Sequence, residues 1–329
     1  MARTADQGLL HIVVPRPREH NYGAGAMTAW TNDEAHRALS RASELLDKAA
    51  DVLDYYTNED LAWNGSPGST AHAERCAPSP FDDRSWRPRV VATAFAAPRL
   101  NLMSAAEFLT SQARLLRGEA PLPGHLALEA LARAVLENSG RAWWLLAPRI
   151  GVRERVARSM VDRLFSAQQA QQLADSIELS SQAAGLSEQI AIIKQLCCEL
   201  GFTYKLTDHS VKVDGIPRPR PTKLVDSLLA ETIYRPSQAV AFRLFSATAH
   251  GTHYAAMRSF EDRGTKVAGE RFMERTFDTV AASHAIGFSL TGFEVALRRA
   301  VVLTGQGLIR IDMFRDQIHK WAWTLPSAP

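Results

Sequence analysis

The sequence predicts an all-α protein built as a bundle of several helices, and three observations lead to that fold class. Apolar residues recur every three or four positions over long stretches, which is the period of an amphipathic helix. Gly and Pro cluster in the segments between those stretches, where helices end. Only residues 202–213 have the Thr, Tyr and Val content of strands, which allows one small β-hairpin there.

The chain divides into a short arm and one helical domain. Residues 1–30 mix Gly, Pro and polar residues without a period, which predicts a flexible N-terminal arm. Residues 31–329 predict a single domain, and its one candidate sub-boundary is the Gly-, Pro- and Ser-rich segment 58–88, interpreted as a loop. Helices are expected over residues 33–56, 90–116, 125–146, 152–179, 186–200, 222–232, 236–258, 268–304 and 312–323.

Two positions inside these helices predict interruptions. Pro98 should kink or restart the helix over 90–116, because its ring clashes with the preceding turn. Gly287 marks an expected break within the helix over 268–304.

Composition and charge exclude several classes of protein. The chain has 329 residues, 46% hydrophobic and 22% charged, which is typical of a globular protein. Its net charge of +3 is too small to indicate by itself a nucleic-acid or membrane partner. Three cysteines, Cys76, Cys197 and Cys198, cannot form a disulfide framework, which favours a reducing, cytoplasmic location.

No export signal or membrane span is expected. The apolar stretch at Leu9–Val14 is too short for a signal peptide and is followed by prolines. The longest apolar region, 281–305, has membrane-spanning length, but its His, Glu and Arg side chains would be costly in hydrocarbon. A buried helix without a membrane partner is therefore the better interpretation.

A polar stripe in the otherwise apolar helix 236–258 is the strongest candidate site. Arg243, Ser246, His250 and His253 are spaced three, four and three residues apart, so they share one helix face. The motifs of nucleotide-binding, zinc-binding and serine-hydrolase sites are absent from the sequence, and no cofactor is expected.

The string RLFSATAH, from Arg243 to His250, resembles the Arg-x(4–6)-His motif of the HEPN superfamily of helical proteins. The likeness covers this one motif and its helix, and Leu244 stands where the family commonly has a polar residue. The resemblance implies a metal-independent endoribonuclease of a toxin or defence type, or an RNA-binding protein, in which two such helices meet across a homodimer. It implies that Arg243 holds the scissile phosphate and His250 acts in acid/base catalysis, with Ser246 and His253 supporting them.

Two other functions compete with the ribonuclease hypothesis. The histidines could instead bind a metal ion or small ligand inside the bundle, because helical bundles build such sites from facing helices. The stripe could also be only a helix–helix interface of an interaction protein. The metal hypothesis uses His250, His253, His284 and Glu294, with Glu129 or Glu137 as further candidates.

Three further features have structural and functional interpretations. A basic run, Arg218, Arg220 and Lys223, could contact RNA phosphates or form a solvated loop. The segment from Val135 to Met160 resembles uncharacterised bacterial helical proteins and implies no activity. An alternating ladder of charges favours a solvated or half-buried structural stripe, and consists of Glu129, Arg133, Glu137 and Arg141.

Overall fold

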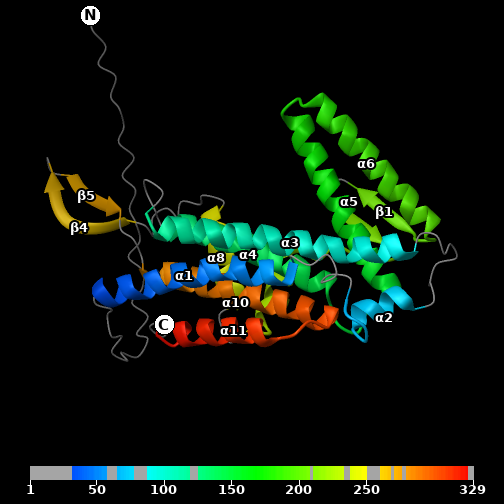
Figure 1. The fold of residues 1–329 in the computed structure, drawn as a ribbon. Coiled ribbons are helices and arrows are strands. Elements are labelled where there is room, and N and C mark those ends of the chain that lie inside the picture. Colours follow the sequence, from blue (N-terminus) through cyan, green and yellow to red (C-terminus); the bar gives the residue numbers. More distant parts are fainter. Residues whose placement is uncertain are drawn as a thin grey trace, which may run out of the picture.

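The computed structural model describes residues 32–57, 65–77, 87–118, 125–207, 210–232, 238–249, 260–267, 270–275 and 279–324. In these residues the chain forms a multi-helix bundle with small β elements, which confirms the predicted fold class (Figure 1). The predicted arm, 1–30, lies outside the described residues. The helices are α1 Asn32–Thr57, α2 Thr70–Cys76, α3 Arg87–Leu116, α4 His125–Leu145, α5 Val152–Ser176, α6 Ser180–Glu199, α7 Pro221–Leu229, α8 Gln238–Ala249, α10 Thr279–Thr304 and α11 Ile309–Ala322.

Helices α1, α3, α4, α10 and α11 lie alongside one another and form the main body of the molecule (Figure 1). The apolar stripe of α1 faces this body: Ala42, Leu46, Ala49 and Leu53 are almost completely buried there. Burial of such a stripe removes apolar surface from water, which is the main force that holds a helix of this kind in place.

Helices α4 and α10 form the centre of the core and run parallel to each other. Gly292 of α10 lies against Leu136 of α4, and a Cβ atom at Gly292 would come within 2.6 Å of the Leu136 side chain. Two turns further along both helices, Arg299 contacts Trp143. The residues of each pair are 156 positions apart in the chain, as expected for parallel helices. The small residue at position 292 therefore sets how closely the two helices approach.

The predicted burial of α10 is confirmed. Among the described helices, α10 alone is long and apolar enough to cross a membrane, and 78% of its apolar window is buried inside the molecule. The helix is continuous through Gly287, so the predicted break is wrong. It ends before Gly305, whose φ of 70° suits the left-handed position that closes a helix.

Helices α5 and α6 stand off the main body as a pair, with a small sheet beside them (Figure 1). Strands β1 Tyr204–Thr207 and β2 Ser210–Val213 pair antiparallel, which confirms the predicted hairpin, and β3 Ile216–Pro217 pairs with β2. Asp214 and Gly215 both have positive φ, the conformation that a tight two-residue turn between strands requires. This region has its own hydrophobic cluster, which includes Val161, Ile193 and Val213.

One prediction near the start of the domain is wrong, and one of the two alternatives at Pro98 is excluded. Segment 58–88 is not loop throughout, because it contains α2, whose Ser69 side chain accepts a hydrogen bond from the His72 amide. A helix of seven residues is too short to show a period in the sequence. Pro98 does not restart α3, which is one helix of 30 residues, since the buried side chains of Phe95 and Leu102 hold both halves against the core.

Two helix starts also differ from prediction. Helix α10 begins at Thr279 rather than Ala268, and strands β4 Phe260–Val267 and β5 Glu270–Arg275 form an antiparallel hairpin before it. Figure 1 shows this hairpin projecting from one end of the body. Helix α6 begins at Ser180 instead of Leu186. The sequence did not indicate its first turns, because they are largely exposed and lack an apolar stripe.

Candidate functional site

The described part of α8 places the predicted polar stripe beside its buried face. Phe242 and Phe245 pack into the core, and the ring of Phe245 contacts Phe288 edge-on at 6.0 Å. Arg243 is exposed and Ser246 is half-buried. Residues three apart share a helix face, so Phe242 and Phe245 anchor one face while Arg243 and Ser246 lie on the adjacent one, with Ser246 at its boundary next to Phe242. The other two members of the stripe, His250 and His253, lie outside the described residues.

Glu129 of α4 reaches α8, a contact that the sequence did not indicate. The Thr248 hydroxyl donates a hydrogen bond to the Glu129 carboxylate at 2.5 Å. Glu129 is completely buried, so this bond gives a buried polar group a hydrogen-bond partner. The contact fixes the C-terminal turn of α8 against α4, two residues before position 250.

His284 lies at the same end of the bundle as this contact. The parallel register of α4 and α10, defined by Leu136 with Gly292, places His284 level with Leu128, next to Glu129. Glu294 is ten residues further along α10, about 15 Å away at 1.5 Å per residue. One metal ion cannot bind both, and the described residues contain no group of three His, Cys, Asp or Glu side chains that could hold a metal ion.

The basic run after β3 is divided between a half-buried part, Arg218, and an exposed part. The Arg218 guanidinium lies over the Phe165 ring, 3.3 Å from its centre, and burial lowers the pKa of Arg218 to about 10. Burial also raises the pKa of nearby Asp162, an effect that Arg141 and Arg218 oppose. Arg220 and Lys223 are exposed, so the structure places these two, and not Arg218, where a solvent-borne polyanion could meet them.

The charge ladder of α4 is a half-buried stripe between these two places. Arg133 donates to Glu137 at 2.8 Å in its middle. One end is Glu129, which contacts α8, and the other is Arg141, which faces Asp162 and Arg218 electrostatically. The contacts of this ladder, all within the protein, agree with its interpretation as a half-buried structural stripe.

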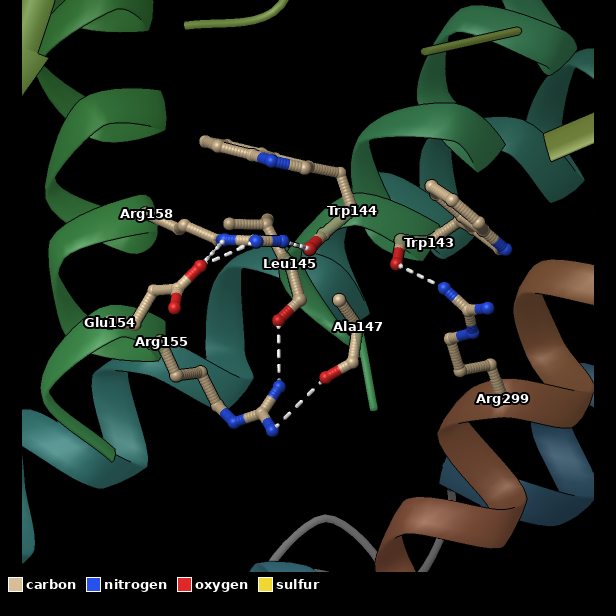
Figure 2. A network of polar contacts seen from close by, with 8 residues as sticks. All are labelled: Trp143, Trp144, Leu145, Ala147, Glu154, Arg155, Arg158 and Arg299. Atoms are coloured by element: carbon tan, nitrogen blue, oxygen red, sulfur yellow. Dashed lines mark hydrogen bonds and ion pairs between the residues drawn. The ribbon is translucent and has the colours of Figure 1, made fainter. Parts of the chain in front are cut away.

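Three arginines bind the C-terminal end of α4, and we call them the arginine clamp (Figure 2). Arg158 donates to the Trp144 carbonyl at 2.7 Å, Arg155 to the next carbonyl along the chain at 2.8 Å, and Arg299 of α10 to the Trp143 carbonyl at 3.1 Å. The Trp144 carbonyl also accepts a backbone hydrogen bond from Ala147 at 3.3 Å. All three carbonyls lie in the last turn of α4, at the negative end of the helix dipole, so cations there are stabilising.

The innermost clamp residue also forms a buried ion pair. Arg155 donates through two nitrogens to both oxygens of Glu74 on α2, at 2.8 and 2.9 Å. The two side chains are only 1% and 9% exposed. The pair ties α2 to the junction between α4 and α5, which the sequence gave no sign of, because segment 58–88 has no helical period.

A cavity of about 500 Å³ lies beside the clamp. One stripe of α10 forms its main wall, and α11, the start of α2 and the turns after α4 and α7 form the rest. Four arginines and two glutamates line this cavity: Arg149, Arg298, Arg299, Arg315, Glu231 and Glu294. The sequence placed Glu294 and Arg298 on one helix but could not show that α2, α11 and two turns enclose them.

The cavity's charges are only partly satisfied within the protein. Arg298 donates to Glu294 at 2.8 Å and also to Asp312, while Arg299 donates to Glu231 at 2.6 Å. Burial raises the pKa of Glu294, and the hydrogen bond from Arg298 opposes that shift. Arg149 and Arg315 are exposed, and neither has a hydrogen-bond or ion-pair partner in the described part of the chain.

Arg149 also has an unusual backbone conformation. Its φ is 64°, in the left-handed region that side chains other than Gly rarely adopt. Such positions are often functional, although the conformation is also what turns the chain from α4 towards α5.

Comparison with known proteins does not identify this chain: no family model matches it, and neither the curated proteins nor the solved structures searched include a match.

Proposed function

We propose that this chain binds RNA at the exposed face of α8 and cleaves it without a metal ion, as an endoribonuclease. The observation that carries the proposal is Arg243: its side chain is exposed and has no hydrogen-bond or ion-pair partner among the described residues. The guanidinium group matches the geometry of phosphate oxygens, so a free arginine held by a rigid helix is suited to bind the scissile phosphate.

The roles of the other residues follow from their positions along the helix. His250 would move the proton of the ribose 2′-hydroxyl, because an imidazole can gain or lose a proton near neutral pH. Ser246 lies one turn from Arg243 on the same face, and His253 one turn beyond His250. The bond from Thr248 to Glu129 supports this arrangement by fixing the turn from which position 250 follows.

A second copy of the chain completes the proposed site. The resemblance of α8 to the HEPN motif implies that two such helices face each other, which would bring two Arg243 side chains to one RNA strand. The exposed Arg220 and Lys223 would then contact phosphates outside the cleaved position.

The test is cleavage of a labelled RNA by the full chain in excess EDTA. Arg243→Ala and His250→Ala should each lower the rate at least 100-fold, because both groups act on the reacting phosphate. Arg243→Lys should retain RNA binding better than RNA cleavage, because an ammonium group keeps the positive charge but not the paired N–H donors that match two phosphate oxygens. Arg114→Ala, at an exposed position on α3, is the matched control and should cleave normally.

Two results would overturn the proposal. One is a folded wild-type protein that cleaves none of a panel of single-stranded and structured RNAs. The other is cleavage by Arg243→Ala at the wild-type rate, which would assign any activity to another part of the chain or to a contaminant.

A further inference from the structure

We propose that the cavity between α10, α11 and the turn after α4 is a binding site for a small organic anion, with Arg149 and Arg315 holding its phosphate or carboxylate group. This site is separate from the face of α8. Arg298, in the cavity wall, is fourteen residues from His284 along α10, a distance of about 21 Å.

The size and lining of the cavity fit a small molecule. Its volume of about 500 Å³ lies within the range of about 300 to 1,000 Å³ that is usual for ligand pockets. Leu146, Val295 and Leu303 contribute apolar surface to its walls. Apolar walls with a few charged groups favour a ligand that has an apolar body and one ionised end.

The charges of the cavity specify an anion rather than a cation. Four arginines and two glutamates line the cavity, and both glutamates already accept hydrogen bonds from arginines. Arg298 also pairs with Asp312 beside the cavity, so the lining and this aspartate together leave one positive charge in excess. Arg149 and Arg315 come from different elements and have no hydrogen-bond or salt-bridge partner among the described residues, although Arg315 attracts Glu294 electrostatically. A bound anion would give both guanidinium groups a charged partner.

Two other arginines of the cavity, Arg298 and Arg299, are held in place by partners within the protein. Arg299 is held by the Trp143 carbonyl and by Glu231, and its guanidinium lies 4.1 Å from the centre of the Trp143 ring. Arg298 is held by Glu294 and Asp312. The wall of the cavity is therefore ordered before a ligand enters, which lowers the entropy lost on binding.

The experiment is calorimetric titration of the full chain with three probes in Tris buffer at low salt: pyrophosphate, 4-nitrophenyl phosphate and phenylacetate. The two compounds with a ring test the apolar walls, and the comparison of phosphate with carboxylate identifies the preferred acid group. We expect 4-nitrophenyl phosphate or phenylacetate to bind more tightly than pyrophosphate, because pyrophosphate has no apolar body.

Variants assign the binding to this cavity. Arg315→Gln and Arg149→Gln should each weaken the best probe about 10-fold or more, as expected for loss of one charge-assisted hydrogen bond. Val302→Trp, at an exposed position on the cavity wall, should block the probes that carry a ring. Arg310→Gln is the matched control, because Arg310 lies on α11 over Tyr55 and does not line the cavity.

Failure of this proposal is distinguishable from failure of the proposed ribonuclease. Absence of binding by all three probes, or equal binding by the wild type and both arginine variants, would overturn the anion site. Arg243→Ala should bind the probes normally, and Arg315→Gln should cleave RNA as the wild type does. Loss of both properties in either variant would contradict the separation of the two sites.

Discussion

The arginine clamp and the arginine-lined cavity lie side by side but use the same side chain in two ways. In the clamp, Arg155 and Arg158 donate to carboxylates and to main-chain carbonyls, so their hydrogen-bonding capacity is used within the protein. In the cavity, Arg149 and Arg315 have no such partners among the described residues. Arg299 belongs to both regions, since it caps α4 and lines the cavity.

This difference separates arginines that stabilise the fold from arginines available to a ligand. A guanidinium with fixed partners contributes to the free energy of unfolding, and its loss leaves a carbonyl or carboxylate unsatisfied. A guanidinium without partners can be removed at little cost to the fold. Stability measurements and binding measurements on the same variants should therefore give opposite rankings.

The largest effect is expected from Glu74→Gln in the clamp. Arg155 would keep its positive charge at 1% exposure without a facing carboxylate, which should lower the free energy of unfolding by about 3 to 5 kcal/mol. Urea denaturation followed by circular dichroism measures this loss. Asp47→Asn, which removes the exposed ion pair with Arg117, is the control and should cost less than about 1 kcal/mol. Equal losses in the two variants would contradict the buried role.

A smaller loss is expected from Arg158→Ala. This change removes the hydrogen bond to the Trp144 carbonyl and the contact of the guanidinium with the Trp144 ring, which together should contribute about 1 to 2 kcal/mol. Thermal and urea unfolding both measure it. An unchanged unfolding midpoint would contradict a stabilising role for Arg158 and would mean that the Ala147 amide and water satisfy the carbonyl without it.

The third prediction concerns pH and the buried carboxyl of the cavity. Burial raises the pKa of Glu294, so the folded protein holds this proton to a higher pH than the unfolded chain. The resulting stability is present below the ordinary pKa of a glutamate and is lost as the pH rises through the raised value. Compared with Glu294→Gln, the wild type should therefore gain stability as the pH falls from about 8 to about 4. A difference between the two proteins that is constant over this range would contradict the shift.

The smallest effect on stability is expected from Arg315→Gln. Because Arg315 is exposed and has no hydrogen-bond partner in the described part of the chain, its loss should change the free energy of unfolding by less than about 0.5 kcal/mol. The same variant should bind anions more weakly. Arg315→Gln should thus lose binding without losing stability, whereas Glu74→Gln should lose stability. A large loss of stability would instead place Arg315 among the structural arginines.

Periodicity predicted the helices that bury a continuous stripe and missed the elements that do not. Helix α1 was predicted almost to the residue, because its apolar positions repeat over its whole length. Helix α2 has only seven residues, and β4 and β5 lie in a charged segment, so neither shows a regular apolar pattern. Those elements are set by contacts with distant parts of the chain, such as the pair between Glu74 and Arg155.

The candidate sites divide in the same way. The shared face of Arg243 and Ser246 follows from spacing within one helix, so the sequence was sufficient to propose it. The cavity needs α10, α11 and two turns to meet, and no local pattern predicts that. Polar residues in the apolar helix α10 were the available signal, and the sequence alone could only assign Glu294 and Arg298 to an ion pair within one helix.

The parallel packing of α4 on α10 has a consequence for how the chain is made. The contacting residues are 156 positions apart, so at 5 to 20 residues per second a ribosome needs roughly 8 to 30 s to synthesise α10 after α4. During that time α3 can already pack on α4, but the opposite apolar face of α4 is uncovered. Arg155 and Arg158 leave the ribosome directly after α4, and both bind its last carbonyls. These two arginines can thus hold the end of α4 in helical form on the nascent chain before α10, with Arg299, is synthesised.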